Sequence, residues 1–248
     1  KIMGKNRMTV FSRDILASRE RRLELMELLR ESVERGFAGF SIQYQPQVET
    51  LTGRLRGAEA LARWHCAKYG DVSPGEFIPL MEQSGLIIPL GQWILRHAMV
   101  QCLEWSRLRP DFHISVNLSY IQLTQGDFIS CLSAALKEIN LAPSGLIMEL
   151  TETYLAKAEE DTLRMIAQMK ELGVKIAMDD FGVGYSSLFS LKNIPVDVVK
   201  IDKGFVKGIT SDLFNATFIR SITDLCHDVG RKVCLEGVET REEYEAVR

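Results

Sequence analysis

The chain has 248 residues, of which 46% are hydrophobic, so it is long enough to bury one large core or two small ones. Its net charge of −3 gives no basic footprint for nucleic acid or for an anionic membrane surface, and we expect no direct DNA or RNA binding. The five cysteines are scattered and form no CxxC pair, which is typical of a reducing compartment. No apolar run is long enough to span a membrane, so we expect a cytoplasmic domain, although a longer protein could carry a membrane anchor upstream.

The first part of the chain predicts a charged helix and then a hairpin. Residues 19–35 place apolar positions among many charges at a helical spacing, and Gly36 ends the pattern. Two extended runs follow, Ile42–Val48 and Leu55–Leu61, and a short turn that contains glycine separates them. Such a turn between extended runs predicts two antiparallel strands.

Beyond the hairpin, helix-like and strand-like segments alternate. The strand-like runs are nearly continuous in apolar character, as parallel strands covered by helices are. They are His113–Asn117, Leu146–Glu149, Val174–Asp179, Val196–Ile201 and Val233–Glu236. The expected helices are 74–83, 89–105, 127–139, 159–172 and 214–229, and Thr240 with Glu243 predicts a capping box that opens a last helix.

This order predicts an α/β fold, a modified (β/α)8 TIM-type barrel with one antiparallel strand. The alternative is an open doubly wound sheet, but no glycine-rich phosphate fingerprint follows any strand. Seven strands are expected by Arg248, where an eighth should follow, so we expect that the final strand–helix unit is missing from this chain.

Oxygen-bearing side chains and one lysine recur where the strand-like runs end. They are Glu59, Asn117, Glu149, Glu152, Asp179, Asp180, Lys200, Glu236 and Glu239. Because active-site groups of a (β/α)8 barrel gather at the C-terminal ends of its strands, we expect one site built from these separate pieces. For each acid taken alone, a structural salt bridge is the ordinary alternative.

The residue types favour Mg²⁺ or Mn²⁺, which prefer carboxylate and amide oxygens. Asp179 and Asp180 cannot point the same way in extended backbone, but a sharp turn, made easy by Gly182 and Gly184, would let Asp180 serve a second ion. Two ions are the usual device for displacement at a phosphodiester. Lys200 could orient a water or offset charge, and Glu236 could accept the proton of that water. The isolated histidines, His113 among them, are expected to have surface or packing roles.

The motifs resemble those of the EAL family, the bacterial cyclic di-GMP phosphodiesterases. Glu59-Ala60-Leu61 is the signature after which that family is named, and the resemblance extends from about Gln43 to Thr240. It implies the modified barrel with one antiparallel strand, and the hydrolysis of one phosphodiester bond of cyclic di-GMP to linear pGpG with two Mg²⁺ or Mn²⁺ ions. It also implies a homodimer.

The resemblance assigns roles to particular residues. It implies that Glu59, Asn117, Glu149 and Asp179 bind the first metal ion, and that Asp179 and Asp180 serve the second. Lys200 and Glu236 then handle the nucleophilic water, while Gln45, Leu61 and Arg63 contact the substrate. Glu152 and Glu239 are expected to anchor the loop 180–187, which resembles the segment that forms the family's dimer contact.

A second, shorter resemblance concerns the beginning of the chain. Gly4-Lys5-Asn6-Arg7 is similar to the closing segment of a GGDEF domain, which suggests a tandem GGDEF-EAL protein. The expected division is therefore a GGDEF-like remnant at 1–11, a linker helix at 12–36 and the EAL barrel at 37–248.

The sequence also allows two functions other than catalysis by an intact EAL domain. One is an inactive EAL domain that senses cyclic di-GMP without cleaving it, and the other is an unrelated barrel enzyme with divalent metal ions. Inactive members usually lack part of the ligand set, which is whole here. Val183 departs from the small or hydroxylated residue that the family commonly has in the metal loop, and the family's closing Gln-Gly-Tyr run does not occur.

Overall fold

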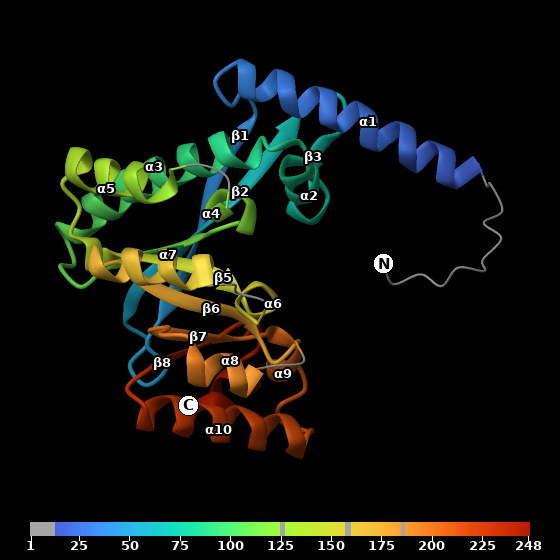
Figure 1. The fold of residues 1–248 in the computed structure, drawn as a ribbon. Coiled ribbons are helices and arrows are strands. Elements are labelled where there is room, and N and C mark those ends of the chain that lie inside the picture. Colours follow the sequence, from blue (N-terminus) through green and yellow to red (C-terminus); the bar gives the residue numbers. More distant parts are fainter. Residues whose placement is uncertain (1–12, 125–126, 157–159, 185–186) are drawn as a thin grey trace. The chain divides into compact units, whose positions relative to one another are not determined.

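The computed structural model describes residues 13–124, 127–156, 160–184 and 187–248 (Figure 1). The chain forms two compact units. The smaller unit comprises the residues up to Ser41 together with Arg63–Leu90, and the larger unit comprises Ile42–Ala62 and Gly91–Arg248. The expected GGDEF-like remnant at 1–11 lies outside the described residues.

The helices and strands alternate along most of the chain. In chain order they are α1 (Arg13–Glu34), β1 (Phe40–Val48), β2 (Leu55–Cys66), β3 (Gly70–Val72), α2 (Pro74–Ser84), α3 (Ile87–Ser106), β4 (His113–Asn117), α4 (Tyr120–Thr124), α5 (Phe128–Ile139), a 3₁₀ turn (Pro143–Gly145), β5 (Leu146–Thr151), α6 (Glu152–Leu155), α7 (Glu160–Glu171), β6 (Lys175–Phe181), α8 (Ser187–Asn193), β7 (Val198–Ile201), α9 (Lys203–Val206), α10 (Leu213–Asp228), β8 (Lys232–Leu235) and α11 (Arg241–Val247). Within the described residues, no helix is both long and apolar enough to cross a membrane.

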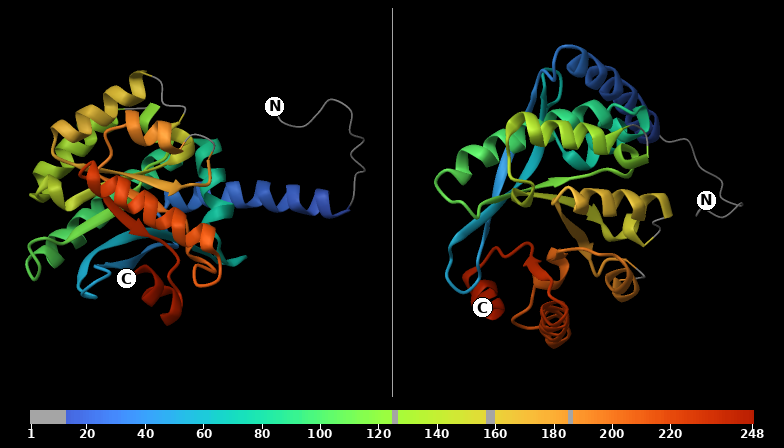
Figure 2. Two further views of the ribbon diagram at one scale, coloured as in Figure 1. Left: turned by 90° about the horizontal axis from the view of Figure 1, so that it is seen from below. Right: turned by 60° about the vertical axis from the view of Figure 1, so that its left-hand side comes forward.

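The larger unit is built on a curved sheet with the strand order β1-β2-β4-β5-β6-β7-β8 (Figure 2). From β2 onward each neighbour along this order runs parallel to the last. β1 and β2 are neighbours joined by a tight turn, in which the Glu49 N–H donates to the Arg54 carbonyl at 2.9 Å, so they must be antiparallel. The predicted α/β fold and hairpin are therefore confirmed.

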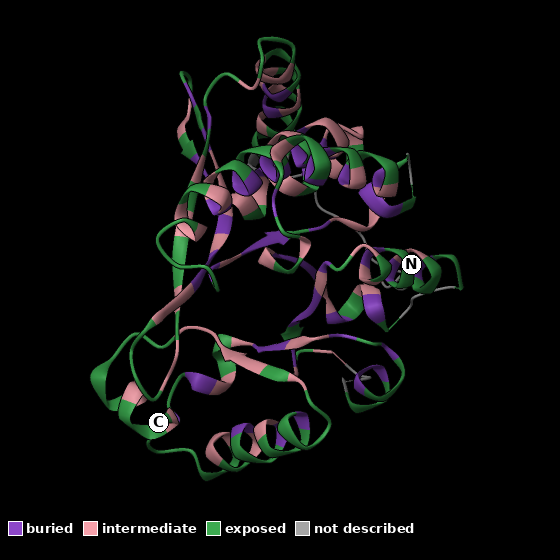
Figure 3. Cartoon of the chain, turned by 90° about the vertical axis from the view of Figure 1, so that its left-hand side faces the viewer, coloured by how far each residue is buried: buried purple, intermediate pink, exposed green. Residues whose placement is uncertain are grey.

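The core of the larger unit follows the parallel strands, where buried residues are concentrated (Figure 3). All residues of β5 except the last are buried, and most residues of β4, β6 and β7 are buried too. Helix α7 packs on β6, and α10 packs on β8. Covering helices of this kind explain why these strands lack the alternation of polar and apolar residues seen in half-exposed sheets.

The smaller unit joins α1 to α2 and to the antiparallel pair formed by β3 with the end of β2. Leu25 and Leu29 of α1 are fully buried. Arg21 pairs with Glu76 of α2 through two hydrogen bonds of 2.7 and 3.0 Å. The helix expected before the barrel is thus present, and it has its own packed partner.

Several elements differ from the sequence prediction. β2 continues to Cys66 because its last residues pair with β3, a short strand that the sequence pattern did not predict. α3 begins before Pro89, which lies in the first turn of the helix, where a missing N–H costs nothing. The predicted capping box at Thr240 and Glu243 is present, and it opens α11. From α11 the Tyr244 hydroxyl donates to the Thr50 carbonyl in the β1–β2 turn at 2.6 Å.

Candidate active site

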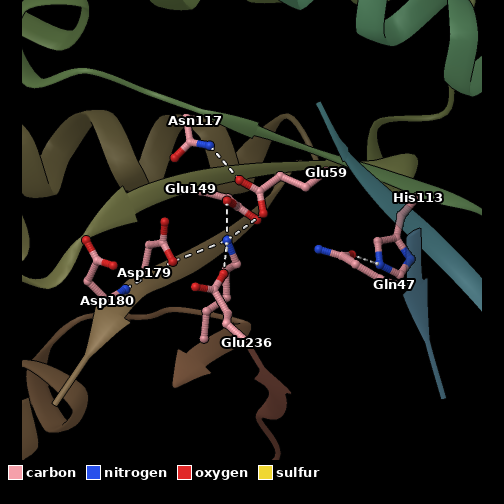
Figure 4. Close-up of polar contacts among 9 residues, drawn as sticks. Gln47, Glu59, His113, Asn117, Glu149, Asp179, Asp180 and Glu236 are labelled. Carbon is pink, nitrogen blue, oxygen red and sulfur yellow. Dashed lines mark hydrogen bonds and ion pairs between the residues drawn. The ribbon is translucent and has the colours of Figure 1, made fainter. Parts of the chain in front are cut away.

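The predicted acidic cluster forms at or near the ends of the parallel strands in the larger unit, except that β2 continues past Glu59 to Cys66 (Figure 4). Glu59 comes from β2, Asn117 from β4, Glu149 from β5 and Asp179 from β6, while Lys200 comes from β7. Glu236 directly follows β8. Because the strands run parallel, their C-terminal ends lie at one edge of the sheet and bring together residues that are far apart in sequence.

Lys200 is the centre of this cluster. Its ammonium nitrogen lies 2.6 Å from a Glu149 oxygen, 2.7 Å from Glu236, 2.9 Å from Glu59 and 3.2 Å from Asp179. The Lys200 side chain is only 2% exposed. The Asn117 amide nitrogen donates to the other oxygen of Glu59 at 2.8 Å, which links the fourth strand to the same network.

Burial and the excess of negative charge control the protonation of the site. Burial alone would lower the pKa of Lys200, but the surrounding carboxylates, Glu149 first, raise it above its ordinary value. Burial raises the pKa of Glu149 to about 8 against the opposing charge of Lys200. Burial likewise raises the pKa of Glu236 and of Asp180. A cation bound here would relieve this repulsion.

Asp179 and Asp180 reach the same site through a break in β6. The register of β6 against β7 shifts between Met178 and Phe181, and Asp180 has φ of 55°, in the left-handed region. The turn that the sequence led us to expect therefore occurs at Asp180 itself. One oxygen from each of Asp179, Asp180 and Glu236 lies within 4.8 Å of the others.

The residues present fit a hard divalent cation. The Oε1 atom of Glu149 is buried and, within the described part of the chain, has no hydrogen-bond partner. A buried carboxylate oxygen without a donor is costly, and a metal ion would satisfy it. The oxygens of Asp179, Asp180 and Glu236 form a second feature of the site, a cluster of carboxylates close enough to one another to hold a metal ion.

Glu152 lies at the start of α6, fully buried, and faces the loop that follows Asp180. Its Oε2 accepts hydrogen bonds from the N–H groups of Gly182 and Gly184, both at 3.1 Å. A Cβ added at Gly184 would lie 2.5 Å from Glu152 Oε1, so only glycine fits there without a shift. Tyr185 and Ser186 of the predicted loop lie outside the described residues.

Four further residues were predicted to belong to the site, and none of the contacts described above joins them to Lys200 or the acids around it. Gln45 is exposed on β1, and Leu61 is partly exposed on β2. Arg63 belongs to the smaller unit. Glu239 is exposed, and among the described contacts its N–H donates to Glu243, while none joins its carboxylate to the loop after Asp180. The roles of these four residues remain predictions.

Two aromatic residues that the sequence analysis did not assign pack against the same loop. Phe205 and Phe218 stack with ring centroids 4.1 Å apart, and a Cβ on Gly182 would lie 2.5 Å from Phe205. Gly182 has φ of 101°, so it is needed both for its backbone conformation and for this close approach. Phe205 stands five residues after Lys200, but the sequence alone gives no sign of this contact.

His113 lies apart from the acidic cluster, at the opposite end of β4 (Figure 4). Its Nε2 is 3.2 Å from Gln47 Oε1, and the ring fills the space left by Gly57, where a Cβ would lie 2.6 Å from the imidazole. Burial, and then the charges of Lys175 and Lys232, lower the pKa of His113 to about 4. This agrees with the packing role expected for it.

Comparisons with known proteins give a consistent result. The chain is 36% identical over 246 residues to the bifunctional diguanylate cyclase/cyclic di-GMP phosphodiesterase MucR of Pseudomonas aeruginosa, covering 99% of this chain and 36% of MucR. It is 36% identical over 202 residues to the cyclic di-GMP phosphodiesterase PdeR of Escherichia coli, covering 82% of this chain and 30% of PdeR. The chain thus spans about a third of the length of these curated relatives.

Solved structures and a family model agree with these relatives. The structure is similar to that of the PaMucR phosphodiesterase in complex with c-di-GMP, with a TM-score of 0.83, 36% identity and 90% coverage of both chains. It is also similar to the EAL enzyme Bd1971 in its cAMP- and cyclic-di-GMP-bound form, with a TM-score of 0.85, 31% identity and coverage of 93% of this chain and 63% of that one. The family model of the EAL domain matches residues 26–248, and the chain therefore belongs to the EAL domain family.

Proposed function

We propose that this chain hydrolyses one phosphodiester bond of cyclic di-GMP to give linear pGpG, with a water activated at two divalent metal ions. The observation that carries the proposal is the Lys200 ammonium enclosed by Glu59, Glu149, Asp179 and Glu236 at the strand ends. The names of MucR and PdeR, which are cyclic di-GMP phosphodiesterases, support the choice of substrate.

The charge of the site supports two ions, Mg²⁺ or Mn²⁺. When all are ionised, the four carboxylates around Lys200 and the carboxylate of Asp180 leave four negative charges after one ammonium is counted against them. Burial, and then the charges of the neighbouring carboxylates, raise the pKa of Glu149 to about 8, which reflects this excess. Two divalent cations would neutralise that excess before a substrate with two phosphates arrives. Glu59, Asn117, Glu149 and Asp179 would hold the first ion, and Asp179 and Asp180 the second.

The residues around the proposed ions would have separate roles in hydrolysis. When bound, the ions would polarise a phosphoryl oxygen and make a water more acidic. Glu236, the most exposed carboxylate of the four around Lys200 at 28%, would accept the proton of that water. Lys200 stays charged and offsets the negative charge that develops on the phosphoryl group. Gln45, Leu61 and Arg63 would contact the substrate.

The loop after Asp180 would connect this chemistry to a homodimer. Val183 lies in this loop and Leu188 and Phe189 directly follow it, and these three apolar side chains are 66%, 58% and 74% exposed, respectively. A second copy of the chain would cover them. Glu152 would then anchor the loop between the dimer contact and the metal ligands, and Glu239 would assist it. A GGDEF-like domain upstream of α1 completes the proposed organisation.

The decisive experiment is incubation with cyclic di-GMP and Mg²⁺ or Mn²⁺, followed by chromatography of the products. Release of pGpG is expected, and the Glu59→Ala variant should release at least about 100-fold less while remaining folded. Tight binding of cyclic di-GMP without product over hours would instead identify a sensor. Replacement of Glu171, an exposed acid of α7, provides the matched control and should leave turnover unchanged.

A further inference from the structure

We propose that Gln122 is a positioning residue that fixes Asn117 by holding the backbone of Ser119. Gln122 lies on α4, which follows the strand that carries Asn117, and neither the family signature nor the proposed chemistry gives it a role. The inference rests on the proposed function in one respect, namely that Asn117 is a metal ligand.

The first observation is the buried hydrogen bond of Gln122. The residue is 6% exposed, and its side-chain Oε1 accepts from the Ser119 N–H at 3.1 Å. The backbone N–H of Gln122 donates to the Ser119 carbonyl at 3.0 Å. Both polar backbone groups of Ser119 are therefore bound by one residue. A buried carboxamide is costly unless it makes such a bond, so an apolar side chain would serve packing alone better.

The second observation is the space that α3 leaves for this side chain. A Cβ added at Gly91 of α3 would lie 1.9 Å from Gln122 Nε2 and 2.5 Å from its Cδ. Glycine inside a helix is unfavourable by itself, by about 1 kcal/mol relative to alanine. Its presence at this position is explained by the fit of the Gln122 carboxamide against the helix backbone.

The third observation connects Ser119 to the metal site. Asn117 is exposed, so packing does not restrict it, and its amide nitrogen donates to Glu59 at 2.8 Å. Its backbone is aligned with Glu149 of β5, and the next residue, Leu118, donates its N–H to the Glu149 carbonyl at 2.9 Å. Ser119 follows Leu118 on the same, C-terminal side of Asn117, so the bond from Gln122 adds a second hold on the chain two residues beyond the ligand. Loss of that bond would weaken the hold on the segment that follows Asn117.

The test measures Mn²⁺ affinity by calorimetry on the whole chain, together with thermal unfolding without metal. Gln122→Met keeps the length of the side chain and removes the acceptor, and it should raise the Kd for Mn²⁺ about tenfold, as loss of a group that orients a ligand does. In the Asn117→Ala background the same substitution should have no further effect, because the ligand that it positions is gone. Effects that multiply in the double variant would overturn the proposal.

Two further variants and one control distinguish the role of Gln122 from misfolding and from a general loss of Mn²⁺ binding. Gln122→Glu retains an acceptor for Ser119 and should bind Mn²⁺ at least as tightly as the parent chain; a tenfold loss would overturn the proposal. If Gln122→Met does not fold, Gly91→Ala displaces the carboxamide by another route and should raise the Kd about threefold or more. Gly75→Ala is the matched control, since a Cβ there meets its nearest atom at 3.7 Å.

The outcomes also separate this inference from the proposed function. If the parent chain binds no Mn²⁺, both the metal site and the role of Gln122 are wrong. If the parent chain binds Mn²⁺ with an affinity that depends on Asn117, and both Gln122→Met and Gly91→Ala leave it unchanged, only the inference about Gln122 is wrong.

Discussion

At the scale of single residues, the site depends on one buried cation among many anions. Four carboxylates lie within 3.2 Å of the Lys200 ammonium nitrogen. Removing one partner of a buried ionic network leaves charges without compensation, which costs more than the network contributes by forming. Lys200 therefore affects the stability of the metal-free chain as well as its chemistry.

Replacing Lys200 with methionine tests this double role. Without metal, the free energy of unfolding in urea should fall by about 3–5 kcal/mol, because Glu149 and its neighbours lose their cation. Added Mn²⁺ should restore part of that loss, while turnover should remain about 10²–10³-fold below that of the parent chain. Lys137→Met, at an exposed position of α5, is the control. Equal stability of Lys200→Met and the control without metal would contradict the argument.

The sequence identified the site residues because each stands where an apolar run ends, a position that parallel strands turn into a shared edge. It did not predict that Asp180 takes φ of 55° or that Lys200 contacts four acids at once. Both depend on how β6 and β7 are aligned, and this register is set by tertiary packing. Gln122 was missed although its hydrogen-bond partner Ser119 stands three residues before it, because its burial depends on the close approach of Gly91 on a different helix.

At the scale of elements, the strands and longer helices could be predicted because their apolar patterns extend over many residues. The short helices α4, α6, α8 and α9 have four to seven residues, too few for a helical period to be recognised. They follow strand ends, where side-chain caps such as Asp202 on α9 and backbone bonds to the sheet decide the conformation. The expected division at residue 37 remains a prediction.

Strand β4 provides a pH dependence that is separate from the metal site. Because the pKa of His113 is about 4 in the folded chain and ordinarily about 6.5, the imidazole is neutral in the fold. Its contribution to stability is therefore present above about pH 6.5 and is lost as the pH falls through about 4. In urea unfolding at about pH 7.5 and about pH 5, His113→Gln should lose less stability between the two than the parent chain. An equal loss in both would show that His113 is not responsible.

At the scale of the whole molecule, metal binding and folding should be linked. A ligand that binds only the folded state raises the free energy of unfolding. The increase grows with the logarithm of the ligand concentration and is about 3 kcal/mol at 100 times the Kd. The acidic cluster exists only when five strand ends and the segment after β8 are together, so the unfolded chain has no equivalent site.

Removal of metal gives the corresponding measurement. The EDTA-treated chain should unfold at a lower temperature than the chain with Mn²⁺, and the difference should grow with Mn²⁺ concentration. The Glu59→Ala variant should respond much less, because it lacks one oxygen ligand. The control replaces Mn²⁺ with NaCl at matched ionic strength, which screens charges without binding. A thermal midpoint that does not change with Mn²⁺ would argue against a metal site.

The hydrogen bond from Tyr244 to Thr50 has a consequence for the order of folding. It joins residues 194 positions apart, the largest separation of any side-chain hydrogen bond in the described residues. Closing so long a loop in a disordered chain costs about 5 kcal/mol of entropy, far more than one hydrogen bond returns. The bond can therefore form only after the intervening strands have already brought the hairpin turn and α11 together. Tyr244 is thus a late reporter of folding: the Tyr244→Phe variant should unfold faster in urea while its folding rate stays nearly unchanged.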